Sequence, residues 1–395
     1  MFKKLLSLAL VAVIVIGMRT TVFAAVSEPE ERYKPITEIS NEELSTFALN
    51  FAKDFDEELS LSIGDILPMY NGDDVLVGFS LSYKLDEIPY GYINLDFTYQ
   101  NPVTEFSIFE EAESLYDSLL PKAMTFTNSN TFDDRIYSIS SNQYAISSAT
   151  DKTTTFYFSN GEQLTSENGQ LPYTIKSKSR SGETEAKYDS HSQLFSSSYA
   201  SGSTVVTTPT YTSKYDKSKS LISESDIESA TNKYACAVAA LTAIANQEGI
   251  WKNSSLADTF NQLWDDTGTT VSSTSGSISY GSTYDSKLST GMTTYAKARG
   301  KSNTTTSTST NPSFSFFTGI ITSSVSGTLS YRINLTNGTE SGHTVNVVGY
   351  CVAKLNNVSS NYLIVADGWY KTAPKYINHS NTDFVDTYGV KYTIK

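Results

Sequence analysis

The chain has 395 residues, a formal net charge of −13, two Cys and three His. This length suits two domains of ordinary size, and two Cys are too few for a disulfide scaffold. Because no paired Cys or His spacing occurs, we expect no metal and no cofactor. No basic cluster of the size that nucleic-acid binding needs is present.

The N-terminus has the layout of a cleaved signal peptide. Lys3 and Lys4 precede a short apolar run over residues 5–17, and residues 22–24 (VFA) suit signal peptidase. The apolar run is too short to cross a bilayer comfortably, and no later stretch is long enough to do so. We therefore expect residues 1–24 to be a signal peptide and the product to be secreted without a membrane span.

The N-terminal half, residues 25–175, is predicted to be a small α+β domain. Ser40 and Glu43 have the spacing of a helix capping box. Residues 75–83 and 90–97 alternate as antiparallel strands do, with turn-forming residues at 86–89 between them. One apolar stripe at helical spacing follows the capping box and consists of Leu44, Phe47, Ala48, Phe51, Ala52 and Phe55. Nothing in this half has a catalytic pattern.

A polar segment separates the two halves. Residues 174–187 have hardly any apolar side chain, and residues 196–211 are mostly Ser, Thr and Val. Such a stretch buries too little apolar surface to offset its ordering entropy, and proteases cut exposed segments of this kind. We predict an exposed linker with a maturation site at residues 176–210. A C-terminal half then covers residues 211–395.

Cys236 is the first candidate for catalysis. Asn232 is a suitable N-cap, and an Ala-rich helix follows that ends near Gly249. This places Cys236 in the first helical turn, where free N–H groups and the helix dipole lower the pKa of a thiol. A small buried hydrophobic residue on an Ala-rich helix is the alternative interpretation of Cys236.

A β-hairpin contributes a second candidate pair. Residues 342–350 (GHTVNVVGY) and 362–367 (YLIVAD) alternate like strands, with a short polar connection between them. If the hairpin folds about Leu355, His343 stands opposite Asp367, and the Cβ atoms of such a pair lie about 5 Å apart. The carboxylate then holds one ring N–H of His343 and leaves the other ring nitrogen to face a thiol.

The remaining His and Cys residues have weaker patterns. His191 lies in the polar linker and His379 in a polar run, so we expect both to be plain surface residues. A disulfide between Cys236 and Cys351 is an alternative for a secreted chain. The position of Cys351 at the far end of its strand from His343 argues against that disulfide.

The C-terminal half resembles papain-like cysteine peptidases, especially the streptopain group of secreted bacterial enzymes, and also the double-glycine-leader peptidases. The resemblance rests on residues 235–240 (ACAVAA), 342–350 and 366–370 (ADGWY). Trp369 stands where papain-like enzymes place a Trp that shelters the His and its partner from solvent. The N-terminal half resembles the streptopain prodomain more weakly, through its Phe-rich helix and residues 90–96 (YGYINLD).

The resemblance implies an α+β fold in which a helix with the Cys packs on an antiparallel sheet with the His and Asp. It also implies a zymogen whose own prodomain is an intramolecular inhibitor, and a protein or peptide substrate. The thiolate of Cys236 would attack a peptide carbonyl, and His343 would protonate the leaving amine and then activate water. Asp367 would orient His343.

The oxyanion donor departs from the family pattern. Papain-like enzymes have a Gln shortly before the nucleophile, whereas Ala230 stands there in this chain. Asn232 is the nearest side-chain amide, and the backbone N–H of Cys236 would help to hold the oxyanion. Transglutaminases and amidases use the same three residue types. A non-catalytic secreted binding protein that retained the fold is the alternative of a different class.

The charge differs sharply between the two halves. Residues 26–170 contain 26 acidic and 7 basic side chains, whereas residues 171–395 contain 16 acidic and 19 basic ones. A solvated acidic surface accounts for this difference, and so does docking of one half on the other. If docking is electrostatic, we expect added salt to speed maturation by screening the contact.

Overall fold

The described chain contains helices separated by runs of consecutive strands. The computed structural model describes residues 36–395, with gaps at 100, 127–131, 141–142, 151–152, 160–162, 168, 170, 172–203, 335–339, 356–357, 370–371 and 381–385. The predicted signal peptide and most of the predicted linker lie outside the described residues. The N-terminal half contains η1 (Ile36–Glu38), α2 (Asn41–Lys53), β1 (Ser62–Tyr70), β2 (Leu76–Leu85), β3 (Ile88–Asp96), β4 (Val103–Ile108), α3 (Leu115–Phe126), β5 (Ile136–Ser140), β6 (Gln143–Ala149), β7 (Thr154–Phe158) and β8 (Gln163–Ser166).

The chain after residue 203 contains the remaining elements. These are β9 (Thr204–Val206), β10 (Thr210–Tyr211), α5 (Lys217–Ser220), α6 (Glu224–Thr231), β11 (Lys233–Tyr234), α7 (Cys236–Gln247), α8 (Leu256–Asp266), β12 (Thr270–Ser275), β13 (Ile278–Ser282), α9 (Asp285–Lys297), β14 (Thr305–Thr310), α10 (Phe314–Thr322), β15 (Ser326–Asn334), β16 (Glu340–Leu355), β17 (Val358–Ala366), β18 (Lys375–Asn378) and β19 (Asp386–Thr393). The fold is therefore of the mixed α+β class that the sequence predicts.

One sheet passes through both halves of the chain. Its strand order is β14-β19-β15-β16-β17-β18-β4-β3-β2-β1-β5-β6-β7-β8, and β9 and β10 also pair with β16. The two halves meet at the antiparallel pair of β4 and β18. A separate small sheet has the order β11-β13-β12. By their contacts, residues 35–395 form one compact unit.

The predicted capping box begins helix α2. The Ser40 hydroxyl accepts a hydrogen bond from the N–H of Glu43 at 3.3 Å, and the Glu43 carboxylate accepts one from the N–H of Ser40 at 2.7 Å. Two N–H groups that have no partner within the helix are thereby satisfied. Phe47 and Phe51 of the predicted stripe are buried, and each buried Phe stabilises the fold by about 1.5–3 kcal/mol.

The strands predicted around residues 75–83 and 90–97 form the hairpin of β2 and β3, which confirms that prediction. The turn between them is shorter than expected. Asp86 and Glu87 both have positive φ, 50° and 66°, as the two central residues of a tight hairpin turn require. Ile88 and Pro89, which the sequence places in the turn, therefore already pair with β2.

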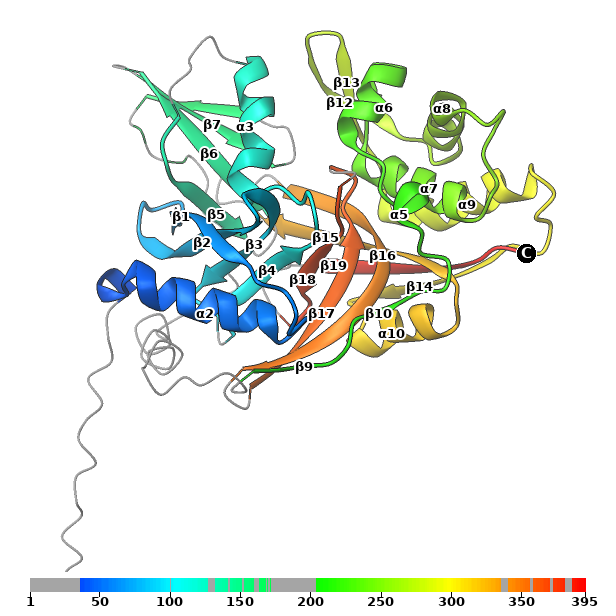
Figure 1. Cartoon of the computed structure of the whole chain (residues 1–395). Helices are drawn as coiled ribbons and strands as arrows, with labels where there is room; N and C mark the ends of the chain where they lie inside the picture. The colour runs from blue at the N-terminus through cyan, green and yellow to red at the C-terminus, as the bar shows by residue number, and fades with distance from the viewer. Residues whose placement is uncertain are drawn as a thin grey trace, which may run out of the picture. The chain divides into compact units, whose positions relative to one another are not determined.

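Helices pack on both faces of the C-terminal part of the sheet. Helix α10 shares a buried apolar cluster with Val345 and Val347 of β16. On the other face, Gln247 at the end of α7 accepts a hydrogen bond from Asn346 of β16 at 3.2 Å. Figure 1 accordingly shows α7 and α10 on opposite sides of β16. Helix α7 therefore packs against the strand that contains His343.

A common apolar core joins the two halves. Buried side chains of α2, β2, β3 and β4 cluster with Val348, Tyr362 and Tyr376 of the C-terminal half. The ring of Phe106 stacks on Tyr376, with 4.4 Å between ring centroids, and lies edge-on to Phe51 at 5.1 Å. The predicted Phe stripe is therefore buried against the C-terminal half as well as against its own strands.

The last residues of the predicted linker are paired. Val205 and Val206 of β9 pair with β16, and Thr210 and Tyr211 of β10 pair with the same strand. The sequence predicts an exposed linker here because the stretch consists mostly of Ser, Thr and Val. Thr and Val are β-branched, however, and strands favour β-branched residues. Among the described helices, none combines the length and hydrophobicity that a membrane crossing needs.

Candidate active site

Cys236 is the first residue of α7, but Asn232 does not cap this helix. The N-cap is Ala235, which makes no side-chain capping hydrogen bond. Asn232 instead ends α6 in the left-handed conformation with φ of 53°, and its side chain is exposed. The prediction of Asn232 as N-cap is therefore wrong. The oxyanion candidate stands on the turn between α6 and β11, four residues before Cys236 in the chain.

The sulfur of Cys236 lies among main-chain N–H groups. The N–H groups of Thr344, Ala237 and Cys236 itself lower the pKa of the thiol. Burial of the sulfur raises this pKa by more, and the Glu224 carboxylate raises it further. The expected lowering at the helix start is therefore wrong for the intact chain, because desolvation outweighs the N–H groups. Cys236 is nevertheless only half-buried, so a small reagent can reach it.

His343 lies on β16 next to the residue that binds the thiol. Its imidazole is buried, and its Nε2 is 2.8 Å from the main-chain carbonyl oxygen of Asp367. A carbonyl oxygen only accepts, so Nε2 carries a proton, and in the neutral form of the ring Nδ1 then has the lone pair. The Thr344 N–H that approaches the Cys236 sulfur directly follows His343 in the chain. Cys236 and His343 are thus held on adjoining elements.

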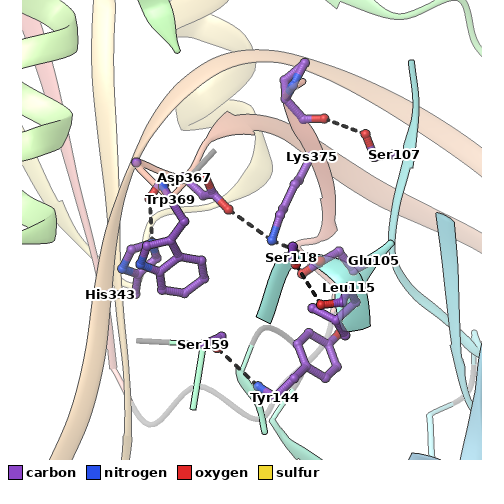
Figure 2. Close-up of polar contacts among 12 residues, drawn as sticks. Glu105, Ser107, Leu115, Ser118, Tyr144, Ser159, His343, Asp367, Trp369 and Lys375 are labelled. Atoms are coloured by element: carbon purple, nitrogen blue, oxygen red, sulfur yellow. Dashed lines mark hydrogen bonds and ion pairs between the residues drawn. The ribbon is translucent and has the colours of Figure 1, made fainter. Parts of the chain in front are cut away.

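The main-chain carbonyl of Asp367 contacts the His343 imidazole, and the Asp367 carboxylate contacts the turn that follows β17. Its carboxylate Oδ1 accepts a hydrogen bond from the N–H of Trp369 at 2.9 Å. Its Oδ2 lies 3.0 Å from Nζ of Lys375. The carboxylate therefore fixes the turn after β17, and that turn aims the Asp367 carbonyl at the imidazole (Figure 2).

The register of the hairpin differs from the predicted one. Leu355 pairs with Val358, and a bulge further along the ladder of β16 and β17 shifts the register once more. The predicted fold about Leu355 is wrong. Continued to the start of β16, the observed register sets Trp369, not Asp367, opposite His343. A bulge adds one unpaired residue that an alternating sequence pattern does not show.

Trp369 covers one face of the His343 ring. The two rings are stacked, with 3.9 Å between centroids and 16° between planes, and Trp369 is only 5 % exposed. Gly368 makes the intervening turn with φ of 80°, and its carbonyl accepts a hydrogen bond from the Tyr234 hydroxyl at 3.2 Å. The chain just before Cys236 thus holds the turn that positions His343.

Two further charged residues reach this turn, and the sequence reasoning missed both. Lys375 of β18 lies between Asp367 and Glu105 of β4, with 3.5 Å between Nζ and the Glu105 Oε1. Glu105 also accepts a hydrogen bond from the Tyr92 hydroxyl. A single charge inside a strand of otherwise uncharged residues, as in residues 103–108 (VTEFSI), is the signal that could have revealed Glu105.

The second Cys and the other His residues stay outside this constellation. Both cysteines are free, so the alternative of a disulfide does not hold. Cys351 is buried, and burial raises the pKa of its thiol to about 12. His379 is half-buried between the rings of Phe314 and Phe317, so its prediction as a plain surface residue is wrong. Helix α10 contributes both Phe rings, and β18 ends directly before His379. His191 lies outside the described residues.

No protein-family model matches the sequence, and no curated protein matches it either. Within the part of the chain that the structure describes, no three His, Cys, Asp or Glu side chains gather as metal ligands would.

Proposed function

We propose that this chain is a cysteine peptidase, with Cys236 as nucleophile and His343 as general base and acid. The supporting observation is the position of the His343 ring. It is bonded through Nε2 to the Asp367 carbonyl, stacked on Trp369 and adjacent to the N–H that approaches the Cys236 sulfur. This leaves Nδ1 as the ring nitrogen that can take the thiol proton.

The proposed reaction uses two acyl-transfer steps. Nδ1 of His343 takes the proton of Cys236, and the thiolate adds to the carbonyl carbon of a peptide bond. The imidazolium protonates the leaving amine as the C–N bond breaks, which leaves a thioester on Cys236. His343 then deprotonates a water molecule that attacks the thioester and frees the thiol. The N–H of Cys236 at the start of α7 is a suitable oxyanion donor.

We further propose that the catalytic part has a papain-like fold and that the N-terminal half is its inhibitory prodomain. The packing of α7 against the strands that contain His343 supports the first proposal. The raised pKa of the Cys236 thiol in the intact chain supports the second, because a protonated thiol is a poor nucleophile. Export through residues 1–24 and cleavage in the linker 176–210 belong to the same proposal.

Self-processing of the precursor tests the peptidase. The chain from Ala25 is prepared with Cys236→Ala and, as a matched control, with Cys351→Ala, and all three proteins are kept under reducing conditions. We expect the parent and the Cys351 variant to yield a fragment of about half the length on a gel, whereas the Cys236 variant stays whole. Processing of the Cys236 variant at the parental rate in a pure preparation would contradict the assignment.

A non-catalytic binding protein is the second candidate, and the raised pKa of the Cys236 thiol favours it. A trace of added protease that nicks the linker separates the two candidates. If the chain is a peptidase, a thiol-reactive probe labels Cys236 faster after nicking, and hydrolysis of a protein substrate appears at the same time. If the site is inactive, labelling stays slow and no hydrolysis follows.

A further inference from the structure

Lys375 lies between one carboxylate from each half of the chain. Its Nζ is 3.0 Å from Oδ2 of Asp367 and 3.5 Å from Oε1 of Glu105. All three side chains are at most 7 % exposed. Figure 2 shows Glu105, Lys375 and Asp367 in sequence, leading to the stacked rings of His343 and Trp369. The N-terminal half thus places a negative charge two contacts away from the residue that orients His343.

The two carboxylates compete for one ammonium group. A buried charge is tolerated only when it is paired, and Lys375 carries one positive charge against the two negative charges of Glu105 and Asp367. Burial raises the pKa of Glu105 although Lys375 lowers it, which indicates incomplete compensation. Asp367 therefore shares its cation for as long as the N-terminal half is in place.

We propose, on the basis of the peptidase function above, that Lys375 is a positioning residue for His343. In this proposal, Glu105 weakens the contact of Lys375 with Asp367 and so limits this positioning. Lys375 anchors the Asp367 carboxylate, the anchored turn aims the Asp367 carbonyl at Nε2, and the aligned imidazole stabilises the Cys236 thiolate. Glu105 weakens the first of these contacts. Departure of the N-terminal half would remove Glu105 and leave Lys375 to Asp367 alone.

Two substitutions should then shift the pKa of the thiol in opposite directions. Glu105→Gln keeps the shape of the side chain but removes its charge, so Lys375 binds Asp367 more firmly. Lys375→Met removes this cation from the Asp367 carboxylate, so the turn after β17 is held less firmly. The other titratable groups near the thiol are Glu224, Tyr234, Tyr331 and His343. Tyr92 and Glu113 line the same pocket as Lys375, and Tyr144 lies near Glu105. Glu105→Gln also removes a charge that raises the pKa of Tyr92, Tyr144 and Tyr331, but burial holds the pKa of these hydroxyls well above 10.0, so they stay protonated during the test.

Alkylation of the full-length chain by iodoacetamide as a function of pH measures the effect. Mass spectrometry of the peptide that contains Cys236 measures the alkylation of this residue separately from that of the buried Cys351. We expect Glu105→Gln to move the profile about half a pH unit down and Lys375→Met about half a unit up, each about threefold in thiolate fraction. Lys375→Arg should lie nearer to the parent than Lys375→Met does.

A matched control and a second background make the test specific. Lys214→Met breaks an ion pair with Glu248 in the same half of the chain, and it should leave the profile unchanged. In a His343→Gln background, the shifts from Glu105→Gln and Lys375→Met should disappear, since both act through the imidazole. Shifts of the same sign, no shift in Glu105→Gln, or shifts that persist without His343 would each overturn the proposal.

The same data separate this proposal from the peptidase function. If His343→Gln alone leaves the parental profile unchanged, the thiol is not coupled to the imidazole and the proposed function fails. If His343→Gln changes the profile but the two charge variants do not, the peptidase stands and Lys375 is only a structural ion-pair partner. If Lys375→Met does not fold, the comparison of Glu105→Gln with the parent decides.

Discussion

Two neighbouring residues of β4 join the halves of the molecule in opposite ways. Phe106 pairs with Tyr376 and enters the common apolar core, while Glu105 reaches the ion pair beside the candidate active site. Successive side chains of a strand point to opposite faces of the sheet. One strand of the N-terminal half therefore supplies an apolar anchor on one face and a charge near the candidate active site on the other.

The two contacts differ in what they contribute. Burial of the aromatic cluster stabilises the assembly of the halves, since a fully buried Phe is worth about 1.5–3 kcal/mol from transfer alone. A buried ion pair contributes little net stability because desolvation offsets the attraction between its charges. We infer that Phe106 determines how firmly the N-terminal half is held, and that Glu105 determines how the site behaves while it is held.

The largest expected effect comes from removal of the apolar anchor. Phe106→Ala should lower the free energy of unfolding by about 3–5 kcal/mol, because it leaves a cavity among Phe51, Tyr362 and Tyr376. Urea denaturation of the full-length chain measures this loss. Tyr284→Ala, at a side chain that is 76 % exposed, is the control and should cost less than about 0.5 kcal/mol. A loss below about 1 kcal/mol for Phe106→Ala would mean that the common core does not hold the halves together.

The turn beside the charged contact should be the next most sensitive position. Gly368 has φ of 80°, and a Cβ there would come within 3.2 Å of the Tyr234 hydroxyl. Gly368→Ala should therefore cost about 1–3 kcal/mol in the free energy of unfolding and also slow the alkylation of Cys236. Gly249 has a similar φ of 65° with no atom close to an added Cβ, so Gly249→Ala isolates the backbone strain. Equal alkylation rates in the two variants would show that the turn does not position His343.

The sequence predicts the local features of this molecule better than it predicts contacts between distant residues. Local patterns predicted the capping box at Ser40 and the hairpin of β2 and β3, because these depend on neighbouring residues alone. The facing of Cys236 and His343 was predicted from a hairpin register that the structure does not have. The bulge in β16, the role of the Asp367 carbonyl and the burial of Lys375 depend on tertiary contacts across the sheet. No spacing within one segment encodes such contacts.

A smaller effect should appear in the pH dependence of stability. Because burial raises the pKa of Glu105, the folded chain binds this proton more tightly than the unfolded chain does. The stabilisation is fully present below the unfolded carboxyl pKa of about 4.5 and is lost as the pH rises through the folded pKa. The stability of the parent relative to Glu105→Gln should therefore fall as the pH rises from about 4.5. Parallel urea-midpoint curves for the two proteins across this range would contradict the raised pKa.

The smallest effect should be that of salt on the contact between the halves. The acidic excess of residues 26–170 suggests electrostatic docking, but the structure joins the halves by a buried apolar core and a buried ion pair. Salt screens exposed charges far more than buried ones, and a change from about 0.05 M to about 0.5 M shortens the Debye length roughly threefold. After the linker is nicked, we expect the halves to stay together on a sizing column at both salt concentrations, and the maturation rate to change less than about twofold. A maturation rate that rises steeply with salt would restore electrostatic docking and reduce the importance of Phe106.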